Sequence, residues 1–449
     1  MKKTYFLILG ALFCGTLSCK KFIDVAPPPD ILVAEQVFTD DTKATAVVTS
    51  IYGSMINGPI GFSNVLTTVY AGLAADELSR FNPGAAHQEF MNNQLSPTNA
   101  QVRNIWNSIY KHIYYANAAI EGLEDANRLT PEVKSRLIGE SRFLRAFCYF
   151  YLVNLWGDVP LVLSTDYRVN AVMPRTASTE VYNAIIQDLA MAKAALPEQV
   201  PGSNTTRPGK AAAAALLART YLYQGAWEKA AAEATGIIQS DTFAPLPAPA
   251  TVFLANSREA LFQLAPTSGF MRETQEMRPL GLPQTILTPH LLSAFEVGDL
   301  RKSAWVDSTT YRNTKYYFAA KYRNTATAPH EFYTLLRAAE LFLIRSEARA
   351  QLLQLTGAAE DLNVVRSRAG LQPVSLQLDQ QQLLQAIEQE RRVEFFAEWG
   401  HRWLDLKRWG GLDTQLGPIK PDWQSTAALF PIPQEELLSN ANLVQNPGY

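Results

Sequence analysis

The most constraining stretch of this chain is an alanine-rich segment from Lys210 to Ser240. Small and apolar residues recur at helical spacing on both sides of Gly225, which predicts two helices that meet across small side chains. A glycine at the turn, with Trp227 shortly after it, is typical of a tetratricopeptide helical hairpin. One such hairpin cannot bury both of its faces, so the sequence should contain others on which it packs.

A second segment, from Arg337 to Gly370, repeats the pattern, with Gly357 at the predicted turn. Its leucines, valines and alanines again recur at helical spacing. Periodicity alone would also fit ordinary packed helices, but two hairpins with the same kind of turn favour a helical-repeat core. Further helices are predicted at residues 42–55, 102–123, 133–156 and 179–196.

The composition is that of an ordinary globular protein. The 449 residues are 47% apolar and 18% charged, with a formal net charge of −2. The 40 basic and 42 acidic residues are interspersed, so no basic block points to nucleic acid as a partner. The chain is long enough for a large core and a second lobe.

The N-terminus predicts export and a lipid anchor. Two lysines precede an apolar run too short to span a membrane, which is typical of a signal peptide over residues 1–18. Ser18 stands directly before Cys19, as in the lipobox of bacterial lipoproteins, and we therefore expect Cys19 to be acylated. Residues 19–41 are then the lipid anchor and tether. A plain cleaved signal with an incidental cysteine is the alternative.

The remaining residues, 42–449, are predicted to form one mainly α domain with an irregular, loop-rich lobe. The lobe segments are rich in Pro, Gly and Asn, and their predicted strands are Ala260–Leu264 and Lys315–Tyr322. Insertions into a repeat protein often carry its binding face, so we expect a ligand to bind at the lobe. The predicted parts are the helical-repeat core at 42–56, 99–240 and 333–411, the lobe at 57–98 and 241–332, and a C-terminal coil at 412–449.

Three glutamates are candidates for catalytic groups. Glu390, Glu394 and Glu398 recur every four residues, so a helix would place their carboxylates on one face. Two of them could serve a glycosidase as acid and nucleophile. They lie, however, among Phe, Trp and Arg residues, which favours ion pairs between helices. The five histidines are far apart and no phosphate-binding loop is present, so we predict no catalytic residue, cofactor or metal.

Several ordered motifs are spread over the chain after the signal peptide. They are Cys19 with the following Phe22-Ile23-Asp24, RFLRAFCYFYLVNLWGDVPLV from Arg142, RPGKAAAAALLARTYLY from Arg207, DLNVVRSRAGL from Asp361, QERRVEFFAEWGHRWLDLKRWG from Gln389 and FPIPQEELLSNANLVQNPGY from Phe430. Together they resemble the SusD/RagB family of nutrient-binding lipoproteins from Bacteroidetes-type bacteria. Several ordered motifs in one chain are more specific than any single motif.

This resemblance implies a fold of tetratricopeptide helix pairs with a second, irregular lobe. It also implies a lipid-anchored protein of the outer membrane that faces the exterior. Such a protein binds an oligosaccharide or a peptide and passes it to a SusC-like TonB-dependent transporter. Lys20 and Lys21 stand where many family members have acidic residues. The competing hypotheses are a helical-repeat lipoprotein that binds proteins only, and a glycoside hydrolase.

For a sugar ligand, we expect aromatic and polar side chains of the lobe to form the site. The apolar C–H face of a pyranose packs on an aromatic ring, while amides and guanidinium groups can bond its hydroxyl groups. For each aromatic residue, the alternative is a place in the core of the lobe. The predicted ligand-binding residues are Arg80, Phe81, Asn82, Asn92, Trp305, Tyr311, Tyr316 and Tyr317.

Overall fold

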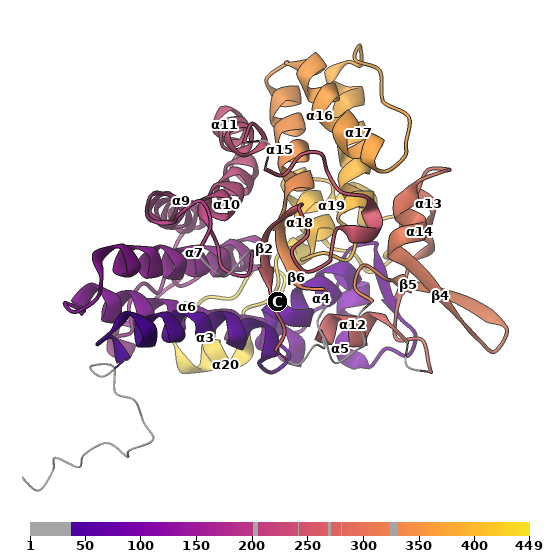
Figure 1. The fold of residues 1–449 in the computed structure, drawn as a ribbon. Coiled ribbons are helices and arrows are strands. Elements are labelled where there is room, and N and C mark those ends of the chain that lie inside the picture. The colour runs from indigo at the N-terminus through magenta and orange to yellow at the C-terminus, as the bar shows by residue number, and fades with distance from the viewer. Residues whose placement is uncertain (1–36, 201–204, 241, 268–270, 280, 324–330) are drawn as a thin grey trace, which may run out of the picture.

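The computed structural model describes residues 37–200, 205–240, 242–267, 271–279, 281–323 and 331–449 (Figure 1). The predicted signal peptide and the predicted anchor residue Cys19 lie outside these ranges. Within them, no helix is both long enough and apolar enough to cross a membrane. The described chain is mainly helical with a few short strands, which confirms the predicted fold class.

The N-terminal half is a stack of helix pairs, at the left of Figure 1. The side chains of Asp40 and Asn99 accept hydrogen bonds from N–H groups in the first turns of two helices, and Pro131 begins a third. These local signals explain why the predicted helices start close to their observed positions. The helices are α3 (Asp41–Asn57), α6 (Ala100–Asp125), α7 (Pro131–Trp156), α9 (Ser178–Ala195), α10 (Lys210–Tyr223) and α11 (Trp227–Ile238).

The alanine-rich hairpin predicted from the sequence is confirmed as α10 and α11. Residues 212–218 of α10 are buried, and Gly225 has φ +66°, the left-handed conformation suited to the turn between the helices. The buried face of α11 runs through Ala230 and Ile237. Ala231, which the pattern also placed on that face, is only partly buried. The buried stripe is narrower than predicted. Successive residues of a helix point in directions about 100° apart, so Ala231 points away from the face that Ala230 buries.

The second hairpin is formed by α15 (Ala338–Gln351) and α16 (Leu355–Arg368), but the predicted turn at Gly357 is wrong. The chain turns at Leu353, which has φ +59°, and Gly357 lies inside α16. The Arg349 guanidinium donates to the Gly357 carbonyl at 3.1 Å. The glycine therefore gives this side chain room beside the helix. Since α15 packs on α11, the two hairpins stack as predicted.

The other elements belong mostly to the lobe and the C-terminal region. In the lobe they are the π-helical turn η3 (Phe62–Leu66), α4 (Thr67–Ala74), β1 (Leu78–Arg80), α5 (Ala85–Asn92), the 3-10 turn η4 (Pro249–Thr251), β2 (Ala260–Leu264), α12 (Arg272–Met277), β3 (Thr285–Leu287), α13 (Pro289–Ala294), α14 (Leu300–Trp305), β4 (Val306–Tyr311) and β5 (Thr314–Ala319). Elsewhere they are α8 (Tyr167–Asn170), β6 (Tyr333–Arg337), α17 (Gln380–Glu394), α18 (His401–Arg408), α19 (Leu412–Leu416), η5 (Ser425–Ala428) and α20 (Gln434–Ser439).

Within the described chain, the strands form three two-stranded antiparallel sheets, β1–β3, β2–β6 and β4–β5. The predicted strand Ala260–Leu264 is confirmed as β2, and β5 overlaps the predicted strand Lys315–Tyr322. Residues 333–337, placed in the helical core by the sequence pattern, instead form β6 and pair with β2 of the lobe. The predicted coil at 412–449 is interrupted by α19, η5 and α20.

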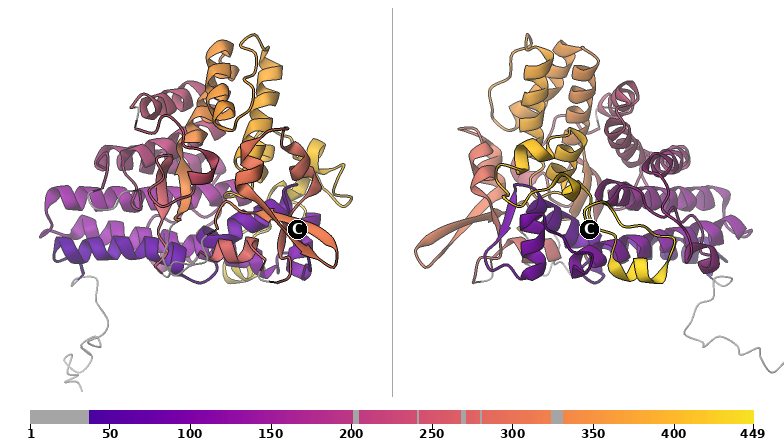
Figure 2. Two further views of the ribbon diagram at one scale, coloured as in Figure 1. Left: turned by 45° about the vertical axis from the view of Figure 1, so that its right-hand side comes forward. Right: turned by 180° about the vertical axis from the view of Figure 1, so that it is seen from behind.

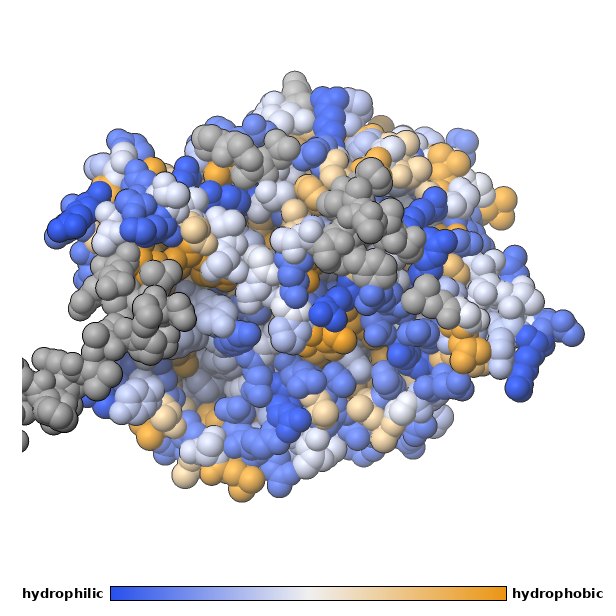
Figure 3. Space-filling view, turned by 60° about the horizontal axis from the view of Figure 1, so that its bottom comes forward, coloured by the Kyte–Doolittle hydropathy of each residue, from blue (hydrophilic) through white to orange (hydrophobic). Residues whose placement is uncertain are grey.

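Lobe and helical stack share one interior. Apolar side chains from both meet in a large hydrophobic cluster, and a smaller cluster lies between α15, α16 and α17. In the large cluster, the Trp399 ring lies 5.2 Å from the Phe147 ring of α7 and 5.1 Å from the Tyr333 ring of β6, measured between centroids. Outside, the face shown in Figure 3 is mostly hydrophilic, with small hydrophobic patches.

The three glutamates predicted to share a helix face do so only in part. Glu390 and Glu394 lie on α17, which ends at Glu394. Glu398 follows in a turn where Ala397 and Trp399 have positive φ values. All three carboxylates are buried and each contacts an arginine, which confirms the ion-pair interpretation. These carboxylates do not form the pair that a glycosidase needs, because none of the three is exposed to a substrate.

Glu394 is the centre of this ion-pair network. Its carboxylate lies 2.9 Å from Arg301 of α14 and 2.5 Å from Arg337 at the end of β6, and it also contacts Arg368 of α16. Burial by itself would raise the pKa of the Glu394 carboxyl, but the three guanidinium groups hold that pKa well below its usual value. One carboxylate therefore ties α17 to the lobe and to the second hairpin.

We expect Glu394→Gln to lower the free energy of unfolding by about 3–5 kcal/mol, because three buried guanidinium groups lose their common counter-charge. The folded-state pKa lies below the unfolded-state value, so this contribution is present at neutral pH and disappears as pH falls through the folded-state pKa. Urea denaturation at neutral and acidic pH measures it. Glu360→Gln, an exposed change on α16, is the control. If Glu394→Gln and Glu360→Gln lowered the free energy of unfolding equally, Glu394 would not be the centre of a stabilising ion-pair network.

Candidate functional site

The lobe carries a β-hairpin, β4–β5, that projects from the right of the molecule (Figures 1 and 2). Its strands are rich in Thr and Tyr, residues that favour extended backbone. Arg312 and Asn313 form the turn, with φ values of 48° and 64°. A two-residue turn with both φ values positive matches the right-handed twist of the strands. The hairpin is therefore a well-defined arm for the side chains that it carries.

Strand alternation decides which tyrosines of this arm share a face. Tyr311 pairs with Thr314, and Tyr316 pairs with Thr309. Because paired residues point to the same side and side chains alternate along each strand, Tyr311 and Tyr316 share one face. Tyr317 points to the opposite face.

Phe81, from the earlier segment of the lobe, packs against both tyrosines. Its ring centroid lies 5.4 Å from that of Tyr311 and 5.2 Å from that of Tyr316, with interplanar angles of 83° and 82°. These are edge-to-face contacts, the arrangement that aromatic pairs prefer. The Phe81 N–H donates to the Gln284 carbonyl at 2.9 Å, which continues the pairing of β1 with β3. We call Phe81, Tyr311 and Tyr316 the aromatic cluster; all three are partly exposed.

Predicted polar residues lie on both sides of Phe81 in the chain. Arg80 ends β1, and its Nη1 donates to the Glu276 carboxylate and to the Thr285 hydroxyl, both at 2.7 Å. The Arg80 side chain keeps 16% of its surface exposed. Asn82 is exposed directly after Phe81. Asn92, the last residue of α5, is also exposed.

Sequence reasoning missed the groups that hold Arg80. Glu276 lies on α12, and Thr285 lies on β3 opposite Arg80 in the β1–β3 sheet. Contacts between segments so distant in the chain leave no local pattern. His87 is a further group near Arg80: its ring stacks on Tyr70 at 5.6 Å, and burial, helped by the Arg80 charge, lowers the His87 pKa. The imidazole is therefore neutral at neutral pH.

Comparison with known proteins identifies the family. A family model described as "Starch-binding associating with outer membrane" matches residues 21–222, and the SusD family model matches residues 296–449. SusD-like protein P2 of Formosa agariphila is 28% identical to this chain and covers 94% of it, with 95% of its own length aligned. The chain belongs to the SusD/RagB family.

Solved structures of SusD-like proteins have the same fold as this family member. A laminarin binding SusD-like protein superposes with a TM-score of 0.77 at 26% identity, over 92% of this chain and 100% of its own. A SusD superfamily protein from Bacteroides vulgatus superposes with a TM-score of 0.80 at 20% identity, over the same shares of the two chains. The resemblance inferred from the motifs is confirmed.

Two of the aromatic residues predicted to bind ligand, Trp305 and Tyr317, do not join the aromatic cluster of this SusD/RagB protein. Trp305 is 1% exposed, its indole N–H donates to the Pro249 carbonyl at 2.8 Å, and the Lys321 ammonium lies 4.5 Å from its ring centroid. Trp305 therefore belongs to the core of the lobe, the alternative weighed for it. Tyr317 lies on the other face of the hairpin, where its ring packs on the core and faces the Lys315 ammonium at 5.2 Å.

We expect Trp305→Ala to destabilise the fold by about 3–5 kcal/mol, because it empties a buried site and leaves the Pro249 carbonyl without its donor. Ligand affinity per folded molecule should fall less than in Tyr311→Ala, because Trp305 supports the base of the hairpin from the core. Urea denaturation measures the first effect and calorimetric titration the second. Tyr311→Ala, at a partly exposed position, is the control and should cost much less stability. If Trp305→Ala lowered affinity without lowering stability, Trp305 would be a ligand-binding residue after all.

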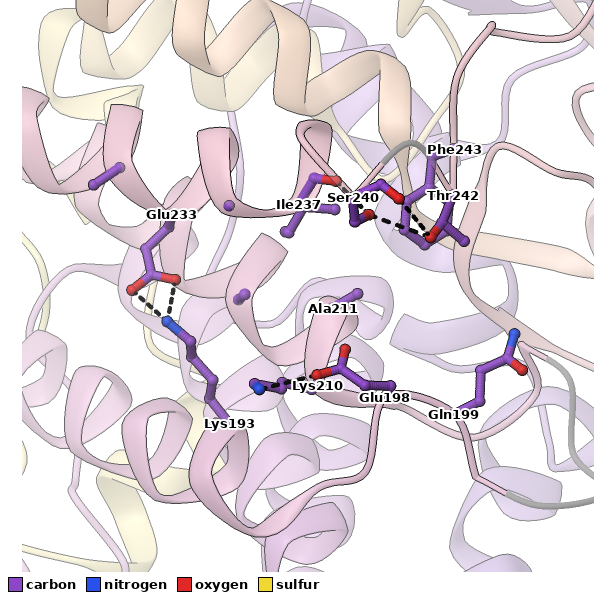
Figure 4. Close-up of a pocket in the computed structure, with 13 residues that line it drawn as sticks. Lys193, Glu198, Gln199, Lys210, Ala211, Glu233, Ile237, Ser240, Thr242 and Phe243 are labelled. Carbon is purple, nitrogen blue, oxygen red and sulfur yellow. Dashed lines mark hydrogen bonds and ion pairs between the residues drawn. The ribbon is translucent and has the colours of Figure 1, made fainter.

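A cavity of about 840 Å³ lies elsewhere, between α9, α10 and α11 (Figure 4). Its charged groups are already paired, since Lys193 lies 2.7 Å from Glu233 and Lys210 lies 2.9 Å from Glu198. Most of its other lining residues are small or aliphatic. Phe243 is the one aromatic ring among the described residues of the lining, and the charges are paired, whereas three rings meet in the aromatic cluster. We therefore place the candidate site at the aromatic cluster despite the size of this cavity.

Two histidines elsewhere in the described chain belong to its interior. Among the described residues, no three His, Cys, Asp or Glu side chains lie close enough together to hold a metal ion. His112 and His401 are buried, and burial lowers the pKa of His112 to about 4. Both rings are therefore neutral parts of the interior at neutral pH.

Proposed function

We propose that this protein binds an oligosaccharide at the aromatic cluster of Phe81, Tyr311 and Tyr316. The observation that carries the proposal is the assembly of three partly exposed rings from two distant segments of the lobe. The apolar face of a pyranose packs on such rings, and Arg80 and Asn82 offer hydrogen bonds to its hydroxyl groups. The starch-binding family description and the laminarin binding neighbour favour a glycan over a peptide.

The site is largely formed before a ligand arrives. Edge-to-face contacts fix the three rings relative to one another, and the tight turn of the hairpin fixes the tyrosines relative to the strands. Glu276 and Thr285 hold the Arg80 guanidinium in one orientation. Such pre-organisation reduces the conformational entropy lost on binding. Asn92 is a further hydrogen-bonding candidate, because its side chain is exposed at the end of α5.

In this proposal the protein is an outer-membrane lipoprotein that is anchored through Cys19 and faces the exterior. It passes its ligand to a SusC-like TonB-dependent transporter. The lipobox-like sequence around Cys19 and the description of the family as associating with the outer membrane support this view. The ligand is bound without turnover, because Glu390 and Glu394, the carboxylates weighed for catalysis, are buried in ion pairs.

We expect Tyr316→Ala to weaken binding of the preferred glycan by about 10-fold, since a lost stacking contact costs about 1–3 kcal/mol. A glycan array on the purified protein first identifies that ligand, and calorimetric titration then measures the affinity. Tyr317→Ala is the matched control, because it removes the same side chain from the adjacent position on the opposite face.

Equal losses of affinity in the Tyr316 and Tyr317 variants would contradict the proposed site. Shortened products after incubation would favour the hydrolase hypothesis. Co-purification of a protein other than a transporter, with no glycan or peptide bound, would favour the scaffold hypothesis.

We expect Cys19→Ala to move the protein from the membrane fraction to the soluble fraction, because it removes the acylated thiol. Buried acyl chains contribute about 0.8 kcal/mol per methylene, so their loss abolishes stable anchoring. Fractionation and metabolic labelling with a fatty acid measure the change, with Cys148→Ala as the control. Unchanged membrane association, with no lipid label on the unmodified protein, would contradict the assignment.

A further inference from the structure

A second hollow lies away from the aromatic cluster, between α6, the loop that follows α7, and the C-terminal segment with α20. Its volume is about 530 Å³, within the range of about 300–1,000 Å³ typical of small-molecule sites. The right-hand view of Figure 2 shows α20 and the C-terminal segment against the helices of the N-terminal half. We call it the α6–α20 hollow. Its lining includes Trp106, Tyr110, Tyr114, Tyr167, Asn170 and Asn440.

Four aromatic side chains line this hollow, and two of them are unusually exposed. Trp106 is 2% exposed and packs on Tyr110, with 4.9 Å between the ring centroids. Tyr114 is 52% exposed and Tyr167 is 76% exposed. Covering an aromatic ring with an apolar surface removes it from water and stabilises the complex by about 25 cal/mol per Å² of apolar area buried. The hollow therefore combines a buried aromatic base with exposed rings that a flat ligand can cover.

The rings at the base are fixed in position. The Tyr110 hydroxyl donates to the Pro160 carbonyl at 2.9 Å. The Arg103 guanidinium of α6 donates to the Glu435 carboxylate of α20 at 2.5 Å. Burial raises the pKa of the neighbouring Glu436 carboxyl, and the Trp106 indole opposes that shift. These two bonds connect α6 to both of the other walls.

The loop wall is also held firmly. The Thr165 N–H donates to the Glu121 carboxylate of α6 at 2.9 Å, and the Asn117 amide of α6 donates to the Val162 carbonyl at 3.1 Å. On the C-terminal side, the Asn440 amide donates to the Met173 carbonyl at 2.8 Å. The hollow is therefore pre-formed, as small-molecule sites usually are.

The polar lining suits a neutral ligand rich in hydroxyl groups. Asn170 donates to the Ser164 carbonyl at 2.8 Å, while its side-chain oxygen has no hydrogen-bond partner among the described residues. A buried acceptor without a donor costs free energy, which a ligand hydroxyl would recover. Asn107 adds an exposed amide, and Lys111 and Glu436 are the charged residues of the lining, one of each sign.

We infer that the α6–α20 hollow is a second sugar-binding site, which takes a neutral pyranose residue stacked on Tyr114 or Tyr167. This inference rests on the proposed function, because it assigns the same class of ligand, but it concerns different residues on different elements. A glycan long enough to span both sites would form its second contact at a high effective concentration.

The test separates this hollow from the aromatic cluster. Tyr167→Ala and Tyr114→Ala are each made in the otherwise unmodified protein and in the Tyr316→Ala variant. Val169→Ala is the control, because Val169 is 52% exposed on α8 beside Tyr167 but does not line the hollow. Calorimetric titration uses laminarihexaose, maltohexaose, cellohexaose and xylohexaose, and thermal melting confirms that each variant folds.

We expect the Tyr316→Ala protein to keep a weaker binding event, which Tyr167→Ala reduces by about 10-fold and Val169→Ala leaves unchanged. Binding that Tyr316→Ala leaves intact and Tyr167→Ala weakens also supports the hollow, and overturns the aromatic cluster as the main site. Residual binding that neither Tyr167→Ala nor Tyr114→Ala alters overturns this inference. Complete loss of binding in the Tyr316→Ala single variant also overturns this inference, and it supports the proposed function. No heat with any of these probes overturns the inference.

Discussion

The structure depends on the burial of charge around Glu394. A carboxylate removed from water costs several kcal/mol unless charged partners surround it, and here Arg301, Arg337 and Arg368 do so. Each of these arginines belongs to a different element, and Glu259 of the lobe also contacts Arg337 at 2.7 Å. Separating these elements would take charged partners away from buried groups on each of them. The network therefore fixes how lobe, strands and helices fit together.

The same constraint reaches the candidate site through the base of the β4–β5 hairpin. Lys321 follows β5, and its ammonium donates to the Glu394 carbonyl at 2.9 Å while facing the Trp305 ring. Trp305 stands directly before β4, and its carbonyl accepts a hydrogen bond from Ala320 at 2.7 Å. The two strands therefore leave the core from a point held by buried polar and cation–π contacts. A hairpin with such a base can carry Tyr311 and Tyr316 as a rigid arm.

The sequence predicted those features that depend on local pattern. Helical spacing was enough to predict the helical stack, and the caps Asp40 and Asn99, seen in the structure, explain where two of its helices begin. Strand β6 was missed because its apolar residues run directly into α15, and only pairing with β2 shows that they are extended. Of the rings predicted to bind ligand, Phe81 does contact Tyr311 and Tyr316, whereas Trp305, with the same sequence signature, is buried. Burial depends on tertiary neighbours that no local pattern contains.

Both aromatic surfaces lie where neighbouring elements hold side chains without covering them. Between α10 and α11, small residues let the helices approach closely, whereas α6 presents Tyr114, which is 52% exposed, to the α6–α20 hollow. The aromatic cluster and the α6–α20 hollow also use segments outside the repeats: the hairpin, the loop after α7 and the C-terminal region. The exposed rings of both surfaces stay partly in water, at a cost in hydrophobic free energy. A rigid scaffold that tolerates this cost leaves the rings free for a ligand to cover.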